Sequence, residues 1–171
     1  MTNAEVSAGY VRDVWPMASG VLVTDVRERV LLVHPTYHRD RWLFPGGGME
    51  RRAKDTPQKA AARELVEELG VALPVGRMLV TDFVLEDGKF FEEVVYVFDG
   101  GVVDEETQAK FRTPEDELRG WAFLDPGEAI ARLAPPDGRR LSEALAARKS
   151  GIPVYLEHGY PAFEQVVGVL P

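Results

Sequence analysis

The amino-acid sequence predicts one domain of mixed α/β class. Short apolar runs typical of strands are interspersed with segments rich in helix formers, and one of these segments carries both a start and a stop signal for a helix. The 171 residues are enough for one well-packed core, and no repeat or linker divides them. We therefore expect one domain over residues 15–150, with a flexible arm over 1–14 and a tail over 151–171.

Two strands are expected to open the domain. Met17–Thr24 and Val30–Val33 are apolar runs on either side of a polar turn at 25–29, a pattern that favours a hairpin. A polar loop follows, and Trp42–Phe44 then reads as the end of a strand. Because Pro45–Gly48 contains one proline and three glycines, we expect a flexible turn there.

The clearest helix follows the glycines. Thr56 suits the N-cap, Pro57 the first helical position and Gly70 the position after the helix end. The intervening Gln58–Leu69 is rich in strong helix formers. A helix over these residues is therefore predicted.

Two further strands are expected at Met78–Leu85 and Phe91–Phe98, since Glu86–Lys89 between them is a hairpin turn signal. Gly100–Glu117 is acidic and has no clear period, which indicates a long surface loop. Another strand is expected at Arg119–Leu124.

Two helices are predicted near the end of the chain. Asp125 and Pro126 are expected to begin a short helix that ends near Leu133, and 137–147 forms a second, amphipathic helix. About twenty residues after it are too short and mixed in pattern to assign.

The composition limits the partners. A formal net charge of −8 argues against nucleic acid, and a protein of this sign that binds phosphates usually supplies positive charge through divalent cations. The absence of cysteine excludes thiolate metal sites and cysteine nucleophiles. With neither a signal-peptide pattern nor a long apolar run, a cytoplasmic location without membrane contact is expected.

Three glutamates of the predicted helix are candidate metal ligands. At about 100° per residue, Ala61, Ala62, Leu65, Val66 and Leu69 cover a core-facing arc. Glu64, Glu67 and Glu68 fall on the other side, with spacings of i,i+3 and i,i+4 that let the carboxylates reach a common point. Mutual repulsion there favours a divalent cation with oxygen ligands, although such a pattern alone is more often a solvated face.

The surrounding residues make the pattern specific. The segment Arg63–Val71 (Arg-Glu-Leu-Val-Glu-Glu-Leu-Gly-Val), with the Trp-Leu-Phe-Pro-Gly-Gly lead-in upstream, resembles the second half of the box of the Nudix hydrolase family. The resemblance covers about residues 17–133. It implies a Nudix-type α/β/α sandwich with a mixed β-sheet between helices, and hydrolysis of a nucleoside diphosphate linked to another moiety.

The first half of the box departs from the family pattern. Its glutamate is replaced by Asp55, and its glycine position holds Met49, as though a short insertion lay between the glycines and the helix. The missing glutamate has a mainly structural part in the family, so Asp55 is not counted among the metal ligands.

The resemblance implies roles for the helix residues. Glu64, Glu67, Glu68 and the carbonyl of Gly47 are the expected ligands of Mg²⁺, for which Mn²⁺ is a substitute. The ions would bind the diphosphate and activate water, so Glu67 and Glu68 are also counted as catalytic. Arg63 is expected to orient a glutamate by ion pairing.

The general base varies within the family, and Glu117 is the first candidate because it directly precedes the expected strand at Arg119–Leu124. The other candidates are the acids at 115, 116, 92 and 93. For substrate binding we name Tyr37 for stacking, Arg41 for phosphate charge, and the two glycines Gly46 and Gly48.

Other functions stay open at this level. A non-catalytic Nudix-like module that binds a nucleotide or ADP-ribose would usually have lost box glutamates, whereas all three are present. An isopentenyl-diphosphate isomerase of the same fold is excluded by the absence of cysteine. Nucleoside triphosphates, nucleotide sugars and ADP-ribose all remain candidate substrates, and a homodimer is left open.

Overall fold

The computed structural model describes residues 15–36, 41–50, 52–86 and 92–162. Within this part, the strands are β1 (Met17–Asp25), β2 (Val30–Pro35), β3 (Gly46–Gly48), β4 (Met78–Val84), β5 (Glu93–Val103), β6 (Leu118–Leu124), β7 (Val154–Glu157) and β8 (Tyr160–Pro161). The helices are α1 (Pro57–Leu69), α2 (Glu105–Gln108), α3 (Pro126–Arg132) and α4 (Pro135–Ser150). None of these helices is long and apolar enough to cross a membrane.

The strands form one mixed sheet in the order β6-β2-β1-β5-β4-β7-β8, and β3 pairs with β1 outside this path. The pairs β1–β5 and β4–β7 are parallel, and the other pairs are antiparallel. The predicted first hairpin is confirmed, because β1 and β2 are antiparallel neighbours.

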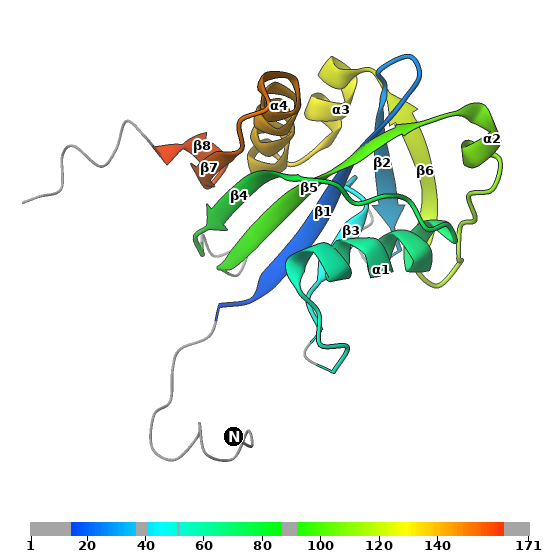
Figure 1. The fold of residues 1–171 in the computed structure, drawn as a ribbon, viewed down its shortest axis with the longest axis horizontal. Coiled ribbons are helices and arrows are strands. Elements are labelled where there is room, and N and C mark those ends of the chain that lie inside the picture. Colours follow the sequence, from blue (N-terminus) through cyan, green and yellow to red (C-terminus); the bar gives the residue numbers. More distant parts are fainter. Residues whose placement is uncertain (1–14, 37–40, 51, 87–91, 163–171) are drawn as a thin grey trace, which may run out of the picture.

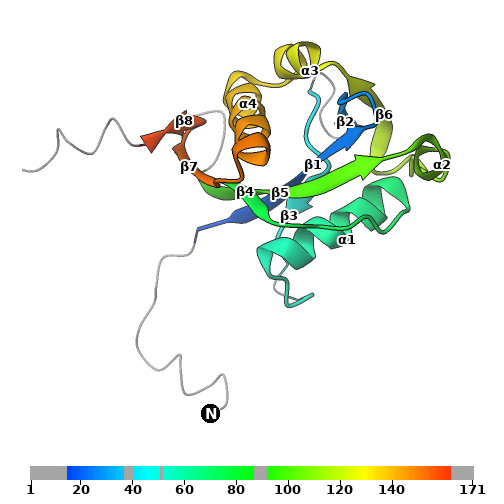
Figure 2. The same ribbon diagram turned by 45° about the horizontal axis from the view of Figure 1, so that its top comes forward.

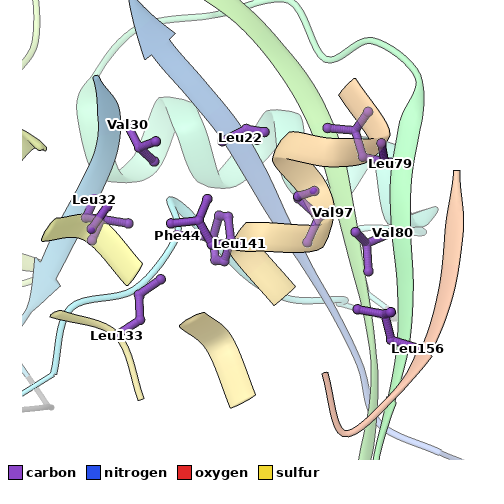
Figure 3. Packing of buried hydrophobic residues seen from close by; sticks show 13 residues of the cluster. Leu22, Val30, Leu32, Phe44, Leu79, Val80, Val97, Leu133, Leu141 and Leu156 are labelled. Carbon is purple, nitrogen blue, oxygen red and sulfur yellow. The ribbon is translucent and has the colours of Figure 1, made fainter. Parts of the chain in front are cut away.

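Helices cover both faces of the sheet (Figures 1 and 2). On one face, Ala61, Leu65 and Leu69 of α1 pack against residues of β1 and β2 such as Val21 and Leu31. On the other face, Ala129 of α3 and Leu141 of α4 pack in a cluster with Leu22, Leu32, Phe44 and Val97 (Figure 3). The expected α/β/α sandwich is therefore confirmed.

The ends of α1 are as predicted. The Thr56 hydroxyl accepts a hydrogen bond from the Lys59 N–H, and Gly70 has φ 71°, the left-handed conformation that ends many helices. The expected arc is wrong at its edges, however. Val66 is 47% exposed, whereas Glu68 is only 6% exposed and belongs to the buried face.

The glycines form a strand, not the expected flexible turn. Gly46–Gly48 pairs with β1, and hydrogen bonds from the Val21 N–H to the Pro45 carbonyl and from the Met49 N–H to the Met17 carbonyl hold both ends. Gly46 has φ 143°, and a Cβ there would lie 2.0 Å from the Ser19 carbonyl oxygen. Only glycine permits so close an approach of two backbones.

The expected loop over 100–117 is wrong in its first part, because β5 continues to Val103 beside β1 and α2 follows. A Cβ at Gly100 would lie 2.5 Å from Val21 Cγ1, so glycine lets the two strands pair here. The turn that joins β4 and β5 lies partly outside the described residues, but the strands pair antiparallel, as a hairpin requires.

The sheet continues beyond residue 150. β7 pairs in parallel with β4, and its Leu156 is fully buried in the core beneath α4. β8 pairs with β7. The segment over 151–171, expected to be a tail, therefore includes two strands. They were not predicted because β7 has only four residues and β8 only two. Both predicted C-terminal helices are present, although Asp125 makes no side-chain capping bond.

Candidate functional site

The helix α1 crosses the glycine strand and presents Glu64 to it. A Cβ at Gly47 would lie 2.5 Å from Glu64 Oε1, so the carboxylate occupies the space that a side chain would need. Burial raises the pKa of Glu64, Arg63 opposes this effect, and Glu67 and Glu117 add to it. A carboxylate is thus placed directly against the backbone of β3.

Glu68 lies deeper in the same place. Its Oε2 accepts a hydrogen bond of 2.9 Å from the Gly46 N–H. The pKa of Glu68 is raised to about 8, mainly by burial and in smaller part by the charges of Glu64, Glu117 and Glu67, while the bond from Gly46 opposes the rise. A bound cation would favour the charged forms of carboxyl groups that lie this close together.

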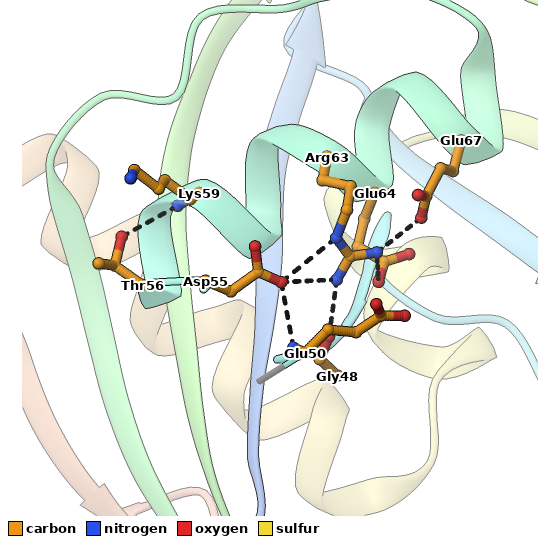
Figure 4. Close-up of polar contacts among 8 residues, drawn as sticks. All are labelled: Gly48, Glu50, Asp55, Thr56, Lys59, Arg63, Glu64 and Glu67. Carbon is orange, nitrogen blue, oxygen red and sulfur yellow. Dashed lines mark hydrogen bonds and ion pairs between the residues drawn. The ribbon is translucent and has the colours of Figure 1, made fainter. Parts of the chain in front are cut away.

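Arg63 organises the remaining carboxylates (Figure 4). One terminal nitrogen donates to Glu64 Oε1 at 2.8 Å and to Glu67 Oε2 at 2.6 Å, and the other donates to the Gly48 carbonyl at 2.9 Å. Burial alone would lower the pKa of Arg63, but the bonds to Asp55 and the glutamates raise it. The arginine therefore stays charged and ties α1 to β3.

Asp55 connects the unusual loop to this arginine. Its Oδ2 accepts from Arg63 Nε at 3.2 Å, from the second terminal nitrogen of Arg63 at 3.0 Å, and from the Glu50 N–H at 3.1 Å (Figure 4). The Glu50 N–H and then Arg63 hold the pKa of this carboxyl below its usual range, although partial burial opposes them. The shorter side chain thus still reaches Arg63.

The three glutamates do not converge on one point in this structure. Among the described residues, no three acidic or histidine side chains are close enough to form a ready metal cluster. The reason is that Glu64 and Glu67 both turn to Arg63, and Glu67 is 49% exposed. The donor set nevertheless suits Mg²⁺ or Mn²⁺, since it consists of carboxylates beside backbone carbonyls.

A cavity of about 320 Å³ opens beside the glycine strand. It lies on the α4 side of the sheet, and residues from five places in the chain line it. They are Ala18, Ser19, Gly20, Arg41, Leu43, Phe44, Gly46, Gly47, Gly48, Val84, Glu93, Val95, Val97, Pro136, Asp137 and Arg140. The cavity and the glutamates thus share the glycine strand.

A buried ion-pair network lies at this cavity. Arg140 of α4 is 4% exposed and donates from Nε to Asp82 Oδ2 at 2.8 Å and from one terminal nitrogen to Asp137. Asp82 is fully buried, and its other oxygen accepts from the Gly159 N–H at 3.1 Å. The turn between β7 and β8 therefore helps to hold an arginine of the cavity.

The other expected site residues divide between the two places. Arg41, Gly46 and Gly48 line the cavity. Glu117 is exposed, and its charge acts on both Glu64 and Glu68, which places it on the side of the glutamates. Tyr37 lies outside the described residues.

The ion pair between Arg140 and Asp82 was not predicted, although the sequence pattern indicates it. Arg140 stands four residues before Ala144 and seven before Ala147, so it lies on the buried stripe of its helix. Asp82 alternates with Val80 and Val84 on the buried face of β4. A charged residue at an apolar position needs a partner, and each is the other's partner.

A family model described as the NUDIX domain matches residues 14–145. The chain belongs to the NUDIX domain family. The family and the fold class predicted from the sequence are both confirmed. The prediction that the chain contains a Nudix hydrolase domain is confirmed as well.

The curated relatives of this NUDIX domain include diphosphoinositol polyphosphate phosphohydrolases. Diphosphoinositol polyphosphate phosphohydrolase 3-alpha of Mus musculus is 42% identical over 71 residues, which are 42% of this chain and 40% of that protein. The chain thus matches well under half the length of this curated relative. The name describes the activity of the mouse protein, and a match over 40% of its length does not give this chain the same substrate.

Solved structures share the fold. A UDP-X diphosphatase superimposes with a TM-score of 0.66 at 20% identity, covering 90% of this chain and 72% of that one. The NUDIX domain of Shewanella oneidensis NrtR, complexed with ADP ribose, gives a TM-score of 0.66 at 17% identity, covering 85% and 98%. At these identities, the likeness concerns the fold alone.

Proposed function

We propose that this protein hydrolyses the pyrophosphate bond of a nucleoside diphosphate linked to another moiety, with Mg²⁺ as cofactor. One observation carries the proposal. Glu64 and Glu68 lie against a glycine strand that also lines a cavity large enough for part of a nucleotide. A place for metal and diphosphate therefore adjoins a place for the group attached to them.

Glu64, Glu67, Glu68 and the Gly47 carbonyl would hold the cation, and Mn²⁺ has the same preference for oxygen donors. When bound, the ion would neutralise phosphate oxygens and lower the pKa of a coordinated water. The protein's share is to fix the donors. Arg63 does this for two of the glutamates through the ion pairs already described.

The roles of the other site residues are proposed from their positions near the glutamates and the cavity. Glu117 is the proposed general base, because it is exposed at the edge of the glutamates and influences two of them. The guanidinium of Arg41 would attract the phosphates, and the backbone of Gly46 and Gly48 leaves them room to approach. Tyr37 keeps its proposed role in stacking a base.

A metal-free binding module is the second candidate. Two observations count against it, namely the retention of all three glutamates and the crowding of Glu64 and Glu68 with other acidic side chains, which adds to the rise of their pKa values. A module that only held a nucleotide through its phosphates would gain nothing from carboxyl groups at this place.

The test is a panel of nucleoside diphosphate derivatives incubated with Mg²⁺ and scored for release of phosphate, pyrophosphate or a nucleoside monophosphate. We expect turnover of at least one compound and none after chelation of the metal. If no compound is hydrolysed, yet a nucleotide raises the melting temperature without metal, the binding module is the correct function. A cytoplasmic location and a homodimer stay predictions, to be checked by fractionation and by light scattering.

A further inference from the structure

The cavity has a polar end away from the glycines. In the sheet, β1 lies between β3 and β5, and Glu93 stands at the beginning of β5, opposite Val84 of β4. The first two turns of α4 contribute Asp137 and Arg140 to the lining of the same cavity. A ligand whose phosphates lie on the glycine strand would therefore extend toward Glu93 and Arg140.

Glu93 has no hydrogen-bond partner among the described residues. Its carboxyl lines the cavity and makes no hydrogen bond or ion pair with any of the residues that the structure describes. Burial raises its pKa, Arg140 opposes that effect, and Asp137 and Asp82 add to it. A half-buried carboxyl without a hydrogen-bond partner is costly, and a ligand that supplies one would remove the cost.

The guanidinium of Arg140 is held in place but keeps a hydrogen-bond donor for a ligand. Asp82 and Asp137 engage Nε and one terminal nitrogen, and within the described part of the chain the other terminal nitrogen makes no hydrogen bond. Because Asp82 is itself held by the Gly159 N–H, the guanidinium cannot easily move. The cavity thus holds a rigid donor, Arg140, and the carboxyl of Glu93, which makes no hydrogen bond to any described residue.

The other walls suit a flat ring. Phe44, Val95 and Val97 supply apolar surface, and Phe44 is held in the core. Among the described lining residues, the charges balance, with Arg41 and Arg140 against Glu93 and Asp137. A densely phosphorylated inositol would need an excess of cations, which this lining does not provide.

We propose that Glu93 and Arg140 are specificity-determining residues that bind the edge of a nucleobase, a neutral heterocycle with a donor and an acceptor side by side. The proposal rests on the proposed function, since the base belongs to the nucleoside diphosphate that the glutamates would act on. Glu93 and Arg140 would then select among substrates by the nucleobase.

The test compares Glu93→Met and Glu93→Gln with a matched control, Glu86→Met, at an exposed glutamate outside the cavity. The substrates are diphosphate derivatives that differ only in the base, together with ribose 5-diphosphate, which has none, and a diphosphoinositol polyphosphate. We expect Glu93→Met to lower kcat/KM for the preferred base by about 10- to 100-fold through KM, as the loss of hydrogen bonds to a charged group would do.

Glu86→Met should hydrolyse every substrate as wild type does, and Glu93→Met should lose far less activity on the base-free substrate than on the preferred base. Glu93→Gln should retain binding but change the order of preference among bases, because an amide donates where a carboxylate only accepts. A purely structural role for Glu93 would lower activity on every substrate alike and leave that order unchanged.

Two results would overturn the proposal: an unchanged order of bases in both Glu93 variants, or a wild-type preference for the diphosphoinositol polyphosphate that these variants keep. If wild type hydrolyses nothing, it is the proposed function that fails. Base binding is then decided by melting temperature, which nucleoside monophosphates should raise in wild type and Glu86→Met but not in Glu93→Met.

Discussion

Burial separates the three glutamates of α1, which look equivalent in the sequence. Glu68 is held inside by the Gly46 N–H, Glu64 fills the space over Gly47, and Glu67 stays half exposed and paired with Arg63. Their spacing on a helix was predictable, because it follows from 3.6 residues per turn. Their burial was not, because it depends on β3, a separate segment of the chain whose position against α1 no pattern in the helix itself reveals.

Replacement of the two adjacent glutamates tests the metal site. Glu67→Gln and Glu68→Gln should each lower turnover by roughly 10²-fold or more, because an amide is a poor ligand for Mg²⁺ and cannot act as a base. Far-ultraviolet circular dichroism should be unchanged. Retained activity in both variants would exclude these glutamates as metal ligands.

The raised pKa of Glu68 gives the metal-free protein a characteristic dependence on pH. The folded protein keeps the proton up to a pH of about 8, whereas the unfolded chain releases it near the usual value of 4.5. The stability that this group contributes is therefore complete below about 4.5 and is lost as the pH rises through about 8. With a chelator present, the free energy of unfolding should fall more steeply over this range in wild type than in Glu68→Gln.

Urea unfolding at pH 5, 7 and 9 would measure this difference. The comparison with Glu68→Gln is needed because Glu64 and Glu93 have raised pKa values as well and contribute slopes of the same sign. Identical slopes in the two proteins would show that Glu68 does not hold its proton in the folded state.

At the scale of elements, the close contact between β3 and α1 predicts how a substitution in β3 changes metal affinity. Gly47→Ala would place a Cβ 2.5 Å from Glu64 Oε1, and the flexible side chain would move away. We expect metal affinity to weaken by about 10- to 100-fold, as for other losses of support around a metal ligand, with little change in stability. Gly120→Ala in β6 is the control, because nothing lies within 4 Å of its added Cβ.

Isothermal titration with Mn²⁺ would measure the affinity of both glycine variants. Equal affinities in Gly47→Ala and Gly120→Ala would mean that Glu64 does not contribute to the metal site from its observed position.

The elements that the sequence predicts well are those specified locally. α1 has its N-cap, its proline and its terminal glycine within its own span, and the structure has the same boundaries. β3 and β7 are specified by their neighbours instead, since three glycines have no strand propensity and β7 has four residues. Both form because β1 and β4 offer unpaired edges, which no local pattern reveals.

At the scale of the molecule, the last strands belong to the core. Leu156→Ala should lower the free energy of unfolding by about 2–5 kcal/mol, because its fully buried side chain would leave a cavity beneath α4. Ile152→Ala, at a side chain that is 70% exposed, is the matched control and should change little. Chemical denaturation of the two variants checks this, and equal stabilities would mean that residues after 150 are a dispensable tail.

The register of β3 on β1 has a thermodynamic consequence for ligand binding. Free glycines sample more backbone conformations than any other residue, and fixing them costs on the order of 1–2 kcal/mol of entropy for each residue. Here Gly46–Gly48 is already immobilised by β1 and by the bonds at its two ends. That entropy is lost during folding, so a cation or a phosphate that meets this strand finds its carbonyl and N–H groups already oriented. Association at the glycines should then need no ordering step, and its rate should be limited by diffusion and by the release of water from the cation.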